Sequence, residues 1–212
     1  MIHVVSFVCN DFQENTYVVF DETKECIIID PGCNAPHERN AIDEYISQRK
    51  LTPVKLINTH CHIDHVLGNG HIAQKYGIGL EIHENEIPIL DALTQVGLMY
   101  NIPTNPSPAP SHFLKEGDII RFGVSELECI FTPGHSPGSL SFYNKNQQIL
   151  ISGDVLFRRS IGRTDLPGGN HQALLDTIQQ KLFLLPADTV VYSGHGPTTT
   201  IGEEKQYNPF FN

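Results

Sequence analysis

The sequence lacks three features that would place a protein in a membrane or in an oxidising compartment. It contains no apolar run near the ~18–20 residues of a membrane-spanning helix. Its start, Met1–Ser6, has neither the charged beginning nor the long apolar core of a signal peptide. Its five cysteines are odd in number, irregularly spaced and without a C-x-x-C pair, so a disulfide framework is not expected. We therefore expect a cytoplasmic protein with no membrane partner.

Positive charge is also scarce. The chain carries 14 lysines and arginines against 24 aspartates and glutamates, for a formal charge of −10, and the basic residues are dispersed. Phosphate binding needs a concentrated cationic surface, so we expect no nucleic-acid partner. A chain of 212 residues buries enough apolar surface to fold without a metal. We therefore expect a single domain over residues 1–212, in which any metal serves chemistry.

Strand-like and helix-like segments are mixed in both halves of the chain, which is typical of an α/β protein. Short β-branched or aromatic runs predict strands, and apolar spacings of three and four predict helices. The predicted strands are 2–8, 16–20, 26–29, 53–58, 80–83, 118–122, 127–131, 140–143, 148–151 and 189–192, and the predicted helices are 41–49, 71–76 and 172–185. Four prolines in 101–111 exclude a regular helix or a central strand there, so we expect a loop or flap between the halves.

Four potential metal ligands fall within six residues, directly after the predicted strand 53–58. They are His60, His62, Asp64 and His65. An extended chain alternates its side chains, so His60, His62 and Asp64 can point the same way, and a turn into the next helix would aim His65 elsewhere. Imidazole and carboxylate suit Zn²⁺ and, less selectively, iron or manganese. The alternative, a loop of surface polar residues, gives no reason to concentrate four ligands in one place.

Three further polar residues follow strand-like runs and lie beside glycine. They are His135, Asp154 and His195. Glycine lets the backbone approach closely, so a neighbouring side chain can be aimed into a cleft. Each alone would be a turn residue, but together with the first cluster they supply what two metals need. Two halves facing each other would make a layered α/β sandwich with these polar clusters converging at the strand ends.

These motifs, H-x-H-x-D-H, T-P-G-H-S-x-G, S-G-D and a final G-H, resemble in this order the metallo-β-lactamase superfamily. Asp30, within Ile28–Gly32, resembles the first motif of that superfamily, so the resemblance covers residues 30–195. It implies an α/β fold of four layers, an αβ/βα sandwich in which two facing mixed sheets are flanked by helices.

The resemblance also implies two divalent metal ions, with zinc ahead of iron or manganese. His60, His62 and His135 would bind the first ion, Asp64, His65 and His195 would bind the second, and Asp154 would bridge them. Asp30 would orient the ligand loop through hydrogen bonds. Cys61 lies between two ligands, but the family does not use this position, so we expect it to pack beneath the loop.

The ligand set narrows the choice within the superfamily. Its β-lactamases usually have cysteine in place of Asp154 and lack His65, and its redox di-iron branch has glutamate in place of His62. The set found here resembles glyoxalase II, the hydroxyacylglutathione hydrolases, and 153–165 and 193–200 are similar to the short bacterial type. The implied reaction is hydrolysis of S-D-lactoylglutathione or a related acyl thioester by a metal-bridging hydroxide. Asp64 and Asp154 would be catalytic, in a monomer or homodimer.

Two features leave the substrate open. Full glyoxalase II has a further C-terminal helical domain with glutathione contacts, whereas 17 residues follow His195 here. We therefore expect no such glutathione-binding domain. Arg163 stands near a basic substrate contact of the family, where it would bind a carboxylate in bidentate fashion. A structural ion pair between Arg163 and Asp165 is the alternative.

Other functions stay open at this point. A persulfide dioxygenase, a mononuclear iron relative, would use His60, His135 and Asp154, and it shares a segment like Gly162–Asp165. A lactonase of the same superfamily is a further alternative. A zinc-stabilised binding module is disfavoured, because seven convergent ligands exceed the four of a structural site.

Overall fold

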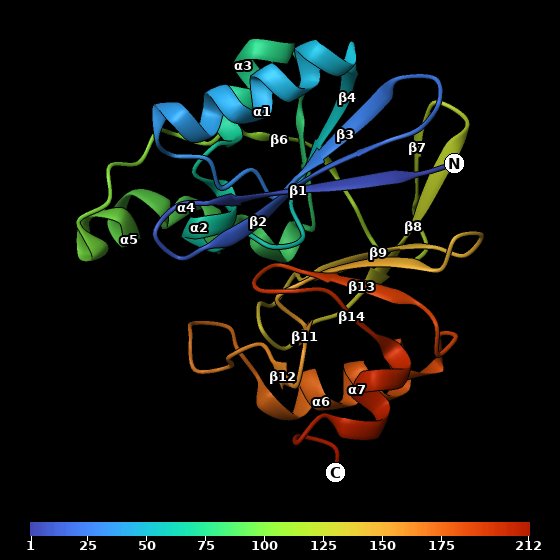
Figure 1. The fold of residues 1–212 in the computed structure, drawn as a ribbon. Helices are drawn as coiled ribbons and strands as arrows, with labels where there is room; N and C mark the ends of the chain where they lie inside the picture. Colours follow the sequence, from blue (N-terminus) through green and yellow to red (C-terminus); the bar gives the residue numbers. More distant parts are fainter. The chain divides into compact units, whose positions relative to one another are not determined.

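The computed structural model describes residues 1–212, which form two compact units. The first unit contains Met1–Leu114 with Arg121–Ser125, and the second contains Lys115–Ile120 with Glu126–Asn212. Figure 1 shows the helices and strands of both units. The single domain expected over the whole chain stays a prediction.

A six-stranded mixed sheet in the order β1-β2-β3-β4-β5-β6 forms the centre of the first unit. β1 to β3 pair antiparallel, and β3 to β6 pair parallel. Its strands are β1 (His3–Cys9), β2 (Glu14–Phe20), β3 (Glu25–Ile29), β4 (Thr52–Ile57), β5 (Leu80–Ile82) and β6 (Pro110–Phe113). Its helices are α1 (Pro36–Arg49), α2 (Ile63–Val66), α3 (Asn69–Tyr76), α4 (Ile87–Asp91), α5 (Leu93–Tyr100) and a 3-10 helix, η1 (Glu84–Glu86).

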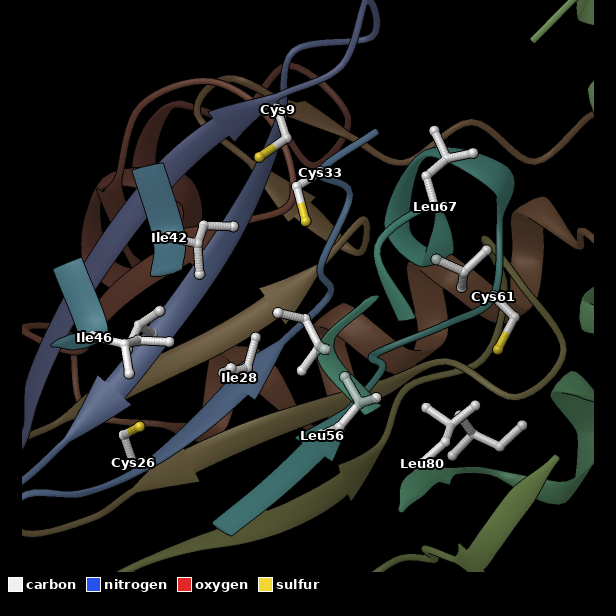
Figure 2. Packing of buried hydrophobic residues seen from close by; sticks show 14 of the residues in the cluster. Cys9, Cys26, Ile28, Cys33, Ile42, Ile46, Leu56, Cys61, Leu67 and Leu80 are labelled. Atoms are coloured by element: carbon white, nitrogen blue, oxygen red, sulfur yellow. The ribbon is translucent and has the colours of Figure 1, made fainter. Parts of the chain in front are cut away.

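β3 is buried on both faces. Every residue from Cys26 to Ile29 is 0% exposed, which explains the short uninterrupted apolar run. Ile28 packs with Ile42 and Ile46 of α1 in the hydrophobic core of this unit (Figure 2). Because side chains alternate along a strand, Ile27 and Ile29 point to the opposite face, where they are equally buried.

The second six-stranded sheet has the order β14-β13-β10-β9-β8-β7 and is also mixed. β8, β9 and β10 pair antiparallel, β10 pairs parallel with β13, and β13 pairs antiparallel with β14. Its strands are β7 (Ile119–Phe122), β8 (Ser125–Phe131), β9 (Leu140–Asn144), β10 (Ile149–Gly153), β13 (Val190–Ser193) and β14 (Thr199–Thr200). The remaining elements are β11 (Leu156–Phe157), β12 (Ser160–Ile161), α6 (His171–Gln180), η2 (Leu182–Leu184) and α7 (Ile201–Tyr207).

The predicted α/β class is confirmed, because both large sheets are mixed and both are accompanied by helices (Figure 1). No helix of the structure combines the length and apolar character that crossing a membrane requires.

A parallel pair of strands ends where the first predicted site residues begin. β3 and β4 are parallel, with Ile29 opposite Ile57. The N–H of Asp30 donates to the carbonyl of Ile57 at 2.9 Å. Asp30 and Asn58 therefore leave the sheet side by side, although 28 residues separate them in sequence.

The second unit repeats this arrangement. β10 and β13 are parallel, with Gly153 opposite Ser193, and the N–H of Gly194 donates to the carbonyl of Gly153 at 2.9 Å. Asp154 and His195 consequently follow the ends of adjacent strands. In parallel sheets, the carboxyl ends of the strands are the usual place for a functional site.

The predicted helix 172–185 is shorter in the structure. α6 ends at Gln180, and η2 follows after a break at Lys181 (φ −120°, ψ −60°). The Nζ of Lys181 donates to the carbonyl of Phe131 at 2.7 Å, and the tighter turn leaves Leu182 0% exposed. The apolar pattern continues past this break, but packing of Leu182 into the core determines where the helix ends.

The sequence pattern predicted the proline-rich segment that precedes β6 better than it predicted the helices α4 and α5. Residues 101–109 contain no helix or strand, as the prolines predicted. They lie within the first unit, directly before its edge strand β6, so the prediction of a loop between the two halves is wrong. Pro110 begins β6 at the edge of the sheet, the place where proline is tolerated. The helices α4 and α5 were not predicted. Pro88 lies in the first turn of α4, where its missing N–H is harmless.

Replacing Ile28 with alanine should lower the free energy of unfolding by about 2–5 kcal/mol, because it leaves a cavity in a fully buried strand. Chemical denaturation measures the change. Val124→Ala is the control, since Val124 is 75% exposed, and it should change the free energy by less than about 0.5 kcal/mol. A loss for Ile28→Ala no larger than the control's would contradict the central position of β3.

Candidate metal centre

The ligand segment of the first unit runs from the end of β4 into α2. His62 has extended backbone angles (φ −63°, ψ 152°), and α2 begins at the next residue. The strand-like alternation therefore stops before Asp64, which lies in the first turn of the helix. Asp64 Oδ2 is 3.5 Å from His65 Nε2. Because the helix begins before Asp64, the strand-like alternation that would have pointed Asp64 the same way as His60 and His62 does not apply. Asp64 lies beside His65 instead.

The three imidazoles of this segment lie close together. The ring centroid of His60 is 4.8 Å from that of His62 and 4.1 Å from that of His65. His60 and His65 are 1% and 0% exposed. Ligand atoms of Asp30, His60 and His65 lie within 4.8 Å of one another, a spacing at which they could hold an ion.

Asp30 uses both carboxylate oxygens to hold this segment. Its Oδ1 accepts the backbone N–H of Thr59 at 2.6 Å, and its Oδ2 accepts the Thr59 hydroxyl at 2.6 Å. Oδ2 is also 3.1 Å from Nδ1 of His65. A carboxylate on one ring nitrogen of a histidine leaves the other as the metal ligand. These contacts support an orienting role for Asp30.

Glu14 of β2 is a further buried carboxylate near His65, and the motifs did not reveal it. It is 0% exposed, and its Oε1 lies 4.0 Å from His65 Nδ1. Burial raises the pKa of Glu14 well above its usual range; His65 opposes this shift, and the charges of Asp30 and Asp64 add to it. The raised pKa favours the neutral form of Glu14, and a cation bound nearby would favour its carboxylate form instead. Asp30 and Asp64 are further acidic groups beside the same imidazole.

Two asparagines hold the backbone of α2. The Nδ2 of Asn58 donates to the carbonyl of His65 at 2.9 Å. The Nδ2 of Asn10 donates to the carbonyl of Asp64 at 2.9 Å and to that of Gly32 at 3.0 Å. Asn58 directly precedes the motif and could have been singled out for that reason. Asn10 lies in the turn between β1 and β2, and nothing in the sequence connects it with the ligands.

The second unit brings His135, Asp154 and His195 together. Asp154 Oδ2 lies 3.6 Å from His135 Nε2 and 3.5 Å from His195 Nε2. A charged hydrogen bond between such groups is about 2.7–2.9 Å long. Two ligands of one tetrahedral ion, each about 2.0–2.1 Å away from it, lie roughly 3.3–3.4 Å apart. The observed spacing is therefore closer to that of shared metal ligands than to that of a hydrogen bond.

Local backbone contacts aim His135 and Asp154. Nδ1 of His135 lies 2.7 Å from the carbonyl oxygen of Arg163, so Nε2 is left as the ligand atom. A Cβ at Gly162 would collide with the carbonyl oxygen of Asp154. Glycine at 162 is therefore needed for the close approach of these two chain segments. The donors of both units, imidazole nitrogen and carboxylate oxygen, fit zinc, iron or manganese.

The side chain of Arg163 forms an ion pair with Asp165. Its Nε and one terminal nitrogen each donate to a different carboxylate oxygen at 2.7 Å. The bidentate pair is exposed, with 59% and 68% of the two side chains accessible. The ion pair between Arg163 and Asp165, one of the two alternatives for this arginine, is therefore present. A substrate contact by the same side chain stays a proposal.

Cys61 packs beneath the loop, as expected. It is 1% exposed and belongs to the core that contains Leu67 and Leu80 (Figure 2). Burial raises the pKa of its thiol well above the usual range, so the thiolate that a metal requires is disfavoured.

Comparison with protein families identifies the chain. The family model described as the metallo-beta-lactamase superfamily matches residues 9–195. The chain belongs to the metallo-beta-lactamase superfamily. The family expected from the motifs is thereby confirmed.

Two relatives in this superfamily are similar over nearly their whole length. The probable metallo-hydrolase YqgX of Bacillus subtilis is 42% identical over 202 residues, which cover 94% of this chain and 93% of YqgX. The hydroxyacylglutathione hydrolase GloC of Haemophilus influenzae is 34% identical over 203 residues, which cover 95% of this chain and 94% of GloC. The family and these names support a metal-dependent hydrolase.

Solved structures of the superfamily confirm the fold. The B3 metallo-beta-lactamase BLEG-1 has a TM-score of 0.90 and 36% identity, over 100% of both chains. TTHA1623, in a di-iron-bound form, has a TM-score of 0.88 and 32% identity, over 98% of this chain and 100% of that one. ETHE1 from Myxococcus xanthus has a TM-score of 0.80 and 26% identity, over 98% and 83%. Among these neighbours, iron is named as a bound metal.

The Arg163–Asp165 pair has a measurable signature. The Arg163 guanidinium lowers the pKa of Asp165 from 3.8 to about 2, so the pair should persist above that pH and be lost as pH falls through it. Carboxyl NMR titration should find this pKa in the wild type and a value near 3.8 in Arg163→Gln. Asp188 serves as the internal control. An ordinary pKa of Asp165 in the wild type would mean that Arg163 is available to bind substrate.

Proposed function

We propose that this protein is a hydrolase with two divalent metal ions that cleaves acyl thioesters in the manner of glyoxalase II. The position of Asp154 carries the proposal. Its Oδ2 lies 3.6 Å from His135 Nε2 and 3.5 Å from His195 Nε2, and this closeness to two imidazoles supports a carboxylate that is shared between two ions. S-D-lactoylglutathione is the first substrate to test, and zinc is the first metal, with iron and manganese as alternatives.

The proposed ligand set is the one that the resemblance to the superfamily implies. His60, His62 and His135 would hold one ion, Asp64, His65 and His195 would hold the other, and Asp154 would be a ligand of both. Family membership supports this set, because the match covers residues 9–195 and therefore every proposed ligand. Asp30 orients His65, and the carbonyl of Arg163 orients His135.

When bound, two such ions lower the pKa of a shared water toward neutrality and polarise the carbonyl that it attacks. The chain's own residues hold the reaction in place. Asp154 fixes the spacing of the two ligand groups. Asp64, 3.5 Å from His65 Nε2, is placed to ligate and to orient the attacking water. His60 and His65 are 1% and 0% exposed, and such burial strengthens electrostatic interactions at these two ligands.

The relative GloC supports a glutathione thioester as substrate. GloC carries the name hydroxyacylglutathione hydrolase, and this chain matches 94% of its length. All five thiols are buried and unbridged, which fits a cytoplasmic enzyme.

Hydrolysis of β-lactams is the second candidate. BLEG-1, described as a B3 metallo-beta-lactamase, is 36% identical over the whole of both chains. A lactam or a lactone is opened by the same attack of water on a carbonyl. A persulfide dioxygenase is less well supported, since a single iron held by His60, His135 and Asp154 gives no function to the Asp64–His65 pair.

The metal-loaded protein, kept free of oxygen, should release thiol from S-D-lactoylglutathione, because hydrolysis requires only water. A thiol reagent follows the reaction with zinc, iron and manganese in turn. A β-lactam, a lactone and an acyl thioester lacking glutathione are the comparison substrates. Absence of thiol release, together with oxygen uptake on glutathione persulfide, would replace the hydrolase by the dioxygenase.

Replacing Asp154 with alanine should reduce thioester hydrolysis by several orders of magnitude and lower the metal content from two ions toward one per chain, because the shared oxygen is lost. Metal analysis and steady-state kinetics measure the two effects. Asp188→Ala, an exposed change in the same unit, is the control and should alter neither. Near-normal turnover and metal content in Asp154→Ala would refute the bridging role.

A further inference from the structure

We infer that Glu86 is a positioning residue that holds His60 and His62 in their metal-binding orientation. The inference rests on the metal site proposed above. Glu86 is the last residue of η1, and it is 0% exposed. Its Oε2 accepts the backbone N–H of Cys61 at 2.7 Å. None of the sequence motifs includes this glutamate.

The N–H of Cys61 is an effective place to hold the ligand segment. It belongs to the planar peptide unit that joins Cys61 to His60, so a hydrogen bond there fixes the orientation of that plane. His62 follows with extended backbone angles (φ −63°, ψ 152°). The directions of both imidazoles therefore depend on the same short stretch of backbone. Their rings are edge to face, with centroids 4.8 Å apart.

Cys61 is held from two sides. Its side chain is 1% exposed and packs into the core, while its N–H is bound by Glu86. Asp30 binds the N–H of Thr59, two residues before Cys61, at 2.6 Å. Two buried carboxylates thus bind alternate backbone donors, those of Thr59 and Cys61, and His60 lies between them.

Glu86 is itself held firmly. Its own N–H donates to the carbonyl of His83 at 3.0 Å, and α4 begins at the next residue. Leu90 of α4 belongs to the same hydrophobic core as Cys61. A site residue supported by helices and core packing is positioned more accurately than one on a free loop. The carboxylate makes a charge-assisted hydrogen bond, which is shorter and stronger than a neutral one.

Glu86→Ala should weaken zinc binding about 10–100-fold, the usual effect of removing a group that orients metal ligands. Competition with a chromophoric chelator measures the affinity, and the absorption spectrum of the Co²⁺ form reports the geometry of the ligands. Glu84→Ala is the matched control, because Glu84 is exposed in the same 3-10 helix. It should change neither measurement.

Two further variants separate the hydrogen bond from charge and from packing. Glu86→Gln keeps an acceptor oxygen near Cys61, so it should retain most of the zinc affinity and the Co²⁺ spectrum. Glu86→Asp keeps the charge, but its side chain is one methylene shorter and does not reach the N–H of Cys61. This variant should therefore lose zinc affinity and show an altered Co²⁺ spectrum. Both changes are small enough to test the inference if Glu86→Ala does not fold. Higher zinc affinity in Glu86→Asp than in Glu86→Gln would overturn the inference. Wild-type zinc affinity in Glu86→Ala would overturn it as well.

The same experiment distinguishes this inference from the proposed function. A wild-type protein that binds zinc but hydrolyses no thioester would remove the proposed activity and leave the role of Glu86 intact. If the wild type hydrolyses thioesters normally but zinc affinity is unchanged in every Glu86 variant, the proposed activity stands and the role of Glu86 is refuted. A wild type that binds neither zinc nor Co²⁺ would overturn both.

Discussion

The hydrogen bonds of Asp30 are the constraint on which the ligand segment of the first unit depends. Its oxygens bind the N–H and hydroxyl of Thr59 and lie 3.1 Å from Nδ1 of His65. One carboxylate thereby restrains both ends of the segment that contains His60 and His62. Asp30 has a φ of 50°, a region that costs a non-glycine residue about 1–3 kcal/mol. The pairing of β3 with β4 holds Asp30 in this conformation, through the hydrogen bond from its N–H to Ile57. The positions of the ligands therefore depend on the buried strands of the core.

In the second unit, the potential metal ligands are oriented by backbone groups and by close contacts at glycine, and not by a carboxylate. His135 is oriented by the carbonyl of Arg163, and Gly162 allows the chain to pass against the backbone of Asp154. Gly134 has a φ of 137°, and a Cβ there would collide with Leu174 of α6. These close contacts explain why glycine occupies positions 134 and 162.

The part of the site that the sequence revealed is the part in which ligands are close together along the chain. His60 to His65 stand out because six residues hold four ligands, and the glycines mark His135, Asp154 and His195. The supports of these ligands could not be found in this way. Asn10, Glu14 and Glu86 reach the ligand segment only through strand pairing and helix packing, across separations of 54, 51 and 25 residues. The end of α6 was missed for a related reason, since burial of Leu182 is a tertiary effect.

The charge around His65 favours a bound cation in the first unit. Asp30 and Asp64 lie 3.1 and 3.5 Å from the nitrogens of His65, a residue that is 0% exposed. Burying carboxylates is costly unless a cation compensates them. A cation bound at His65 Nε2 would offset this charge. The carboxylates of Asp30 and Asp64 beside a fully buried His65 are thus a physical reason to expect a cation in this part of the first unit.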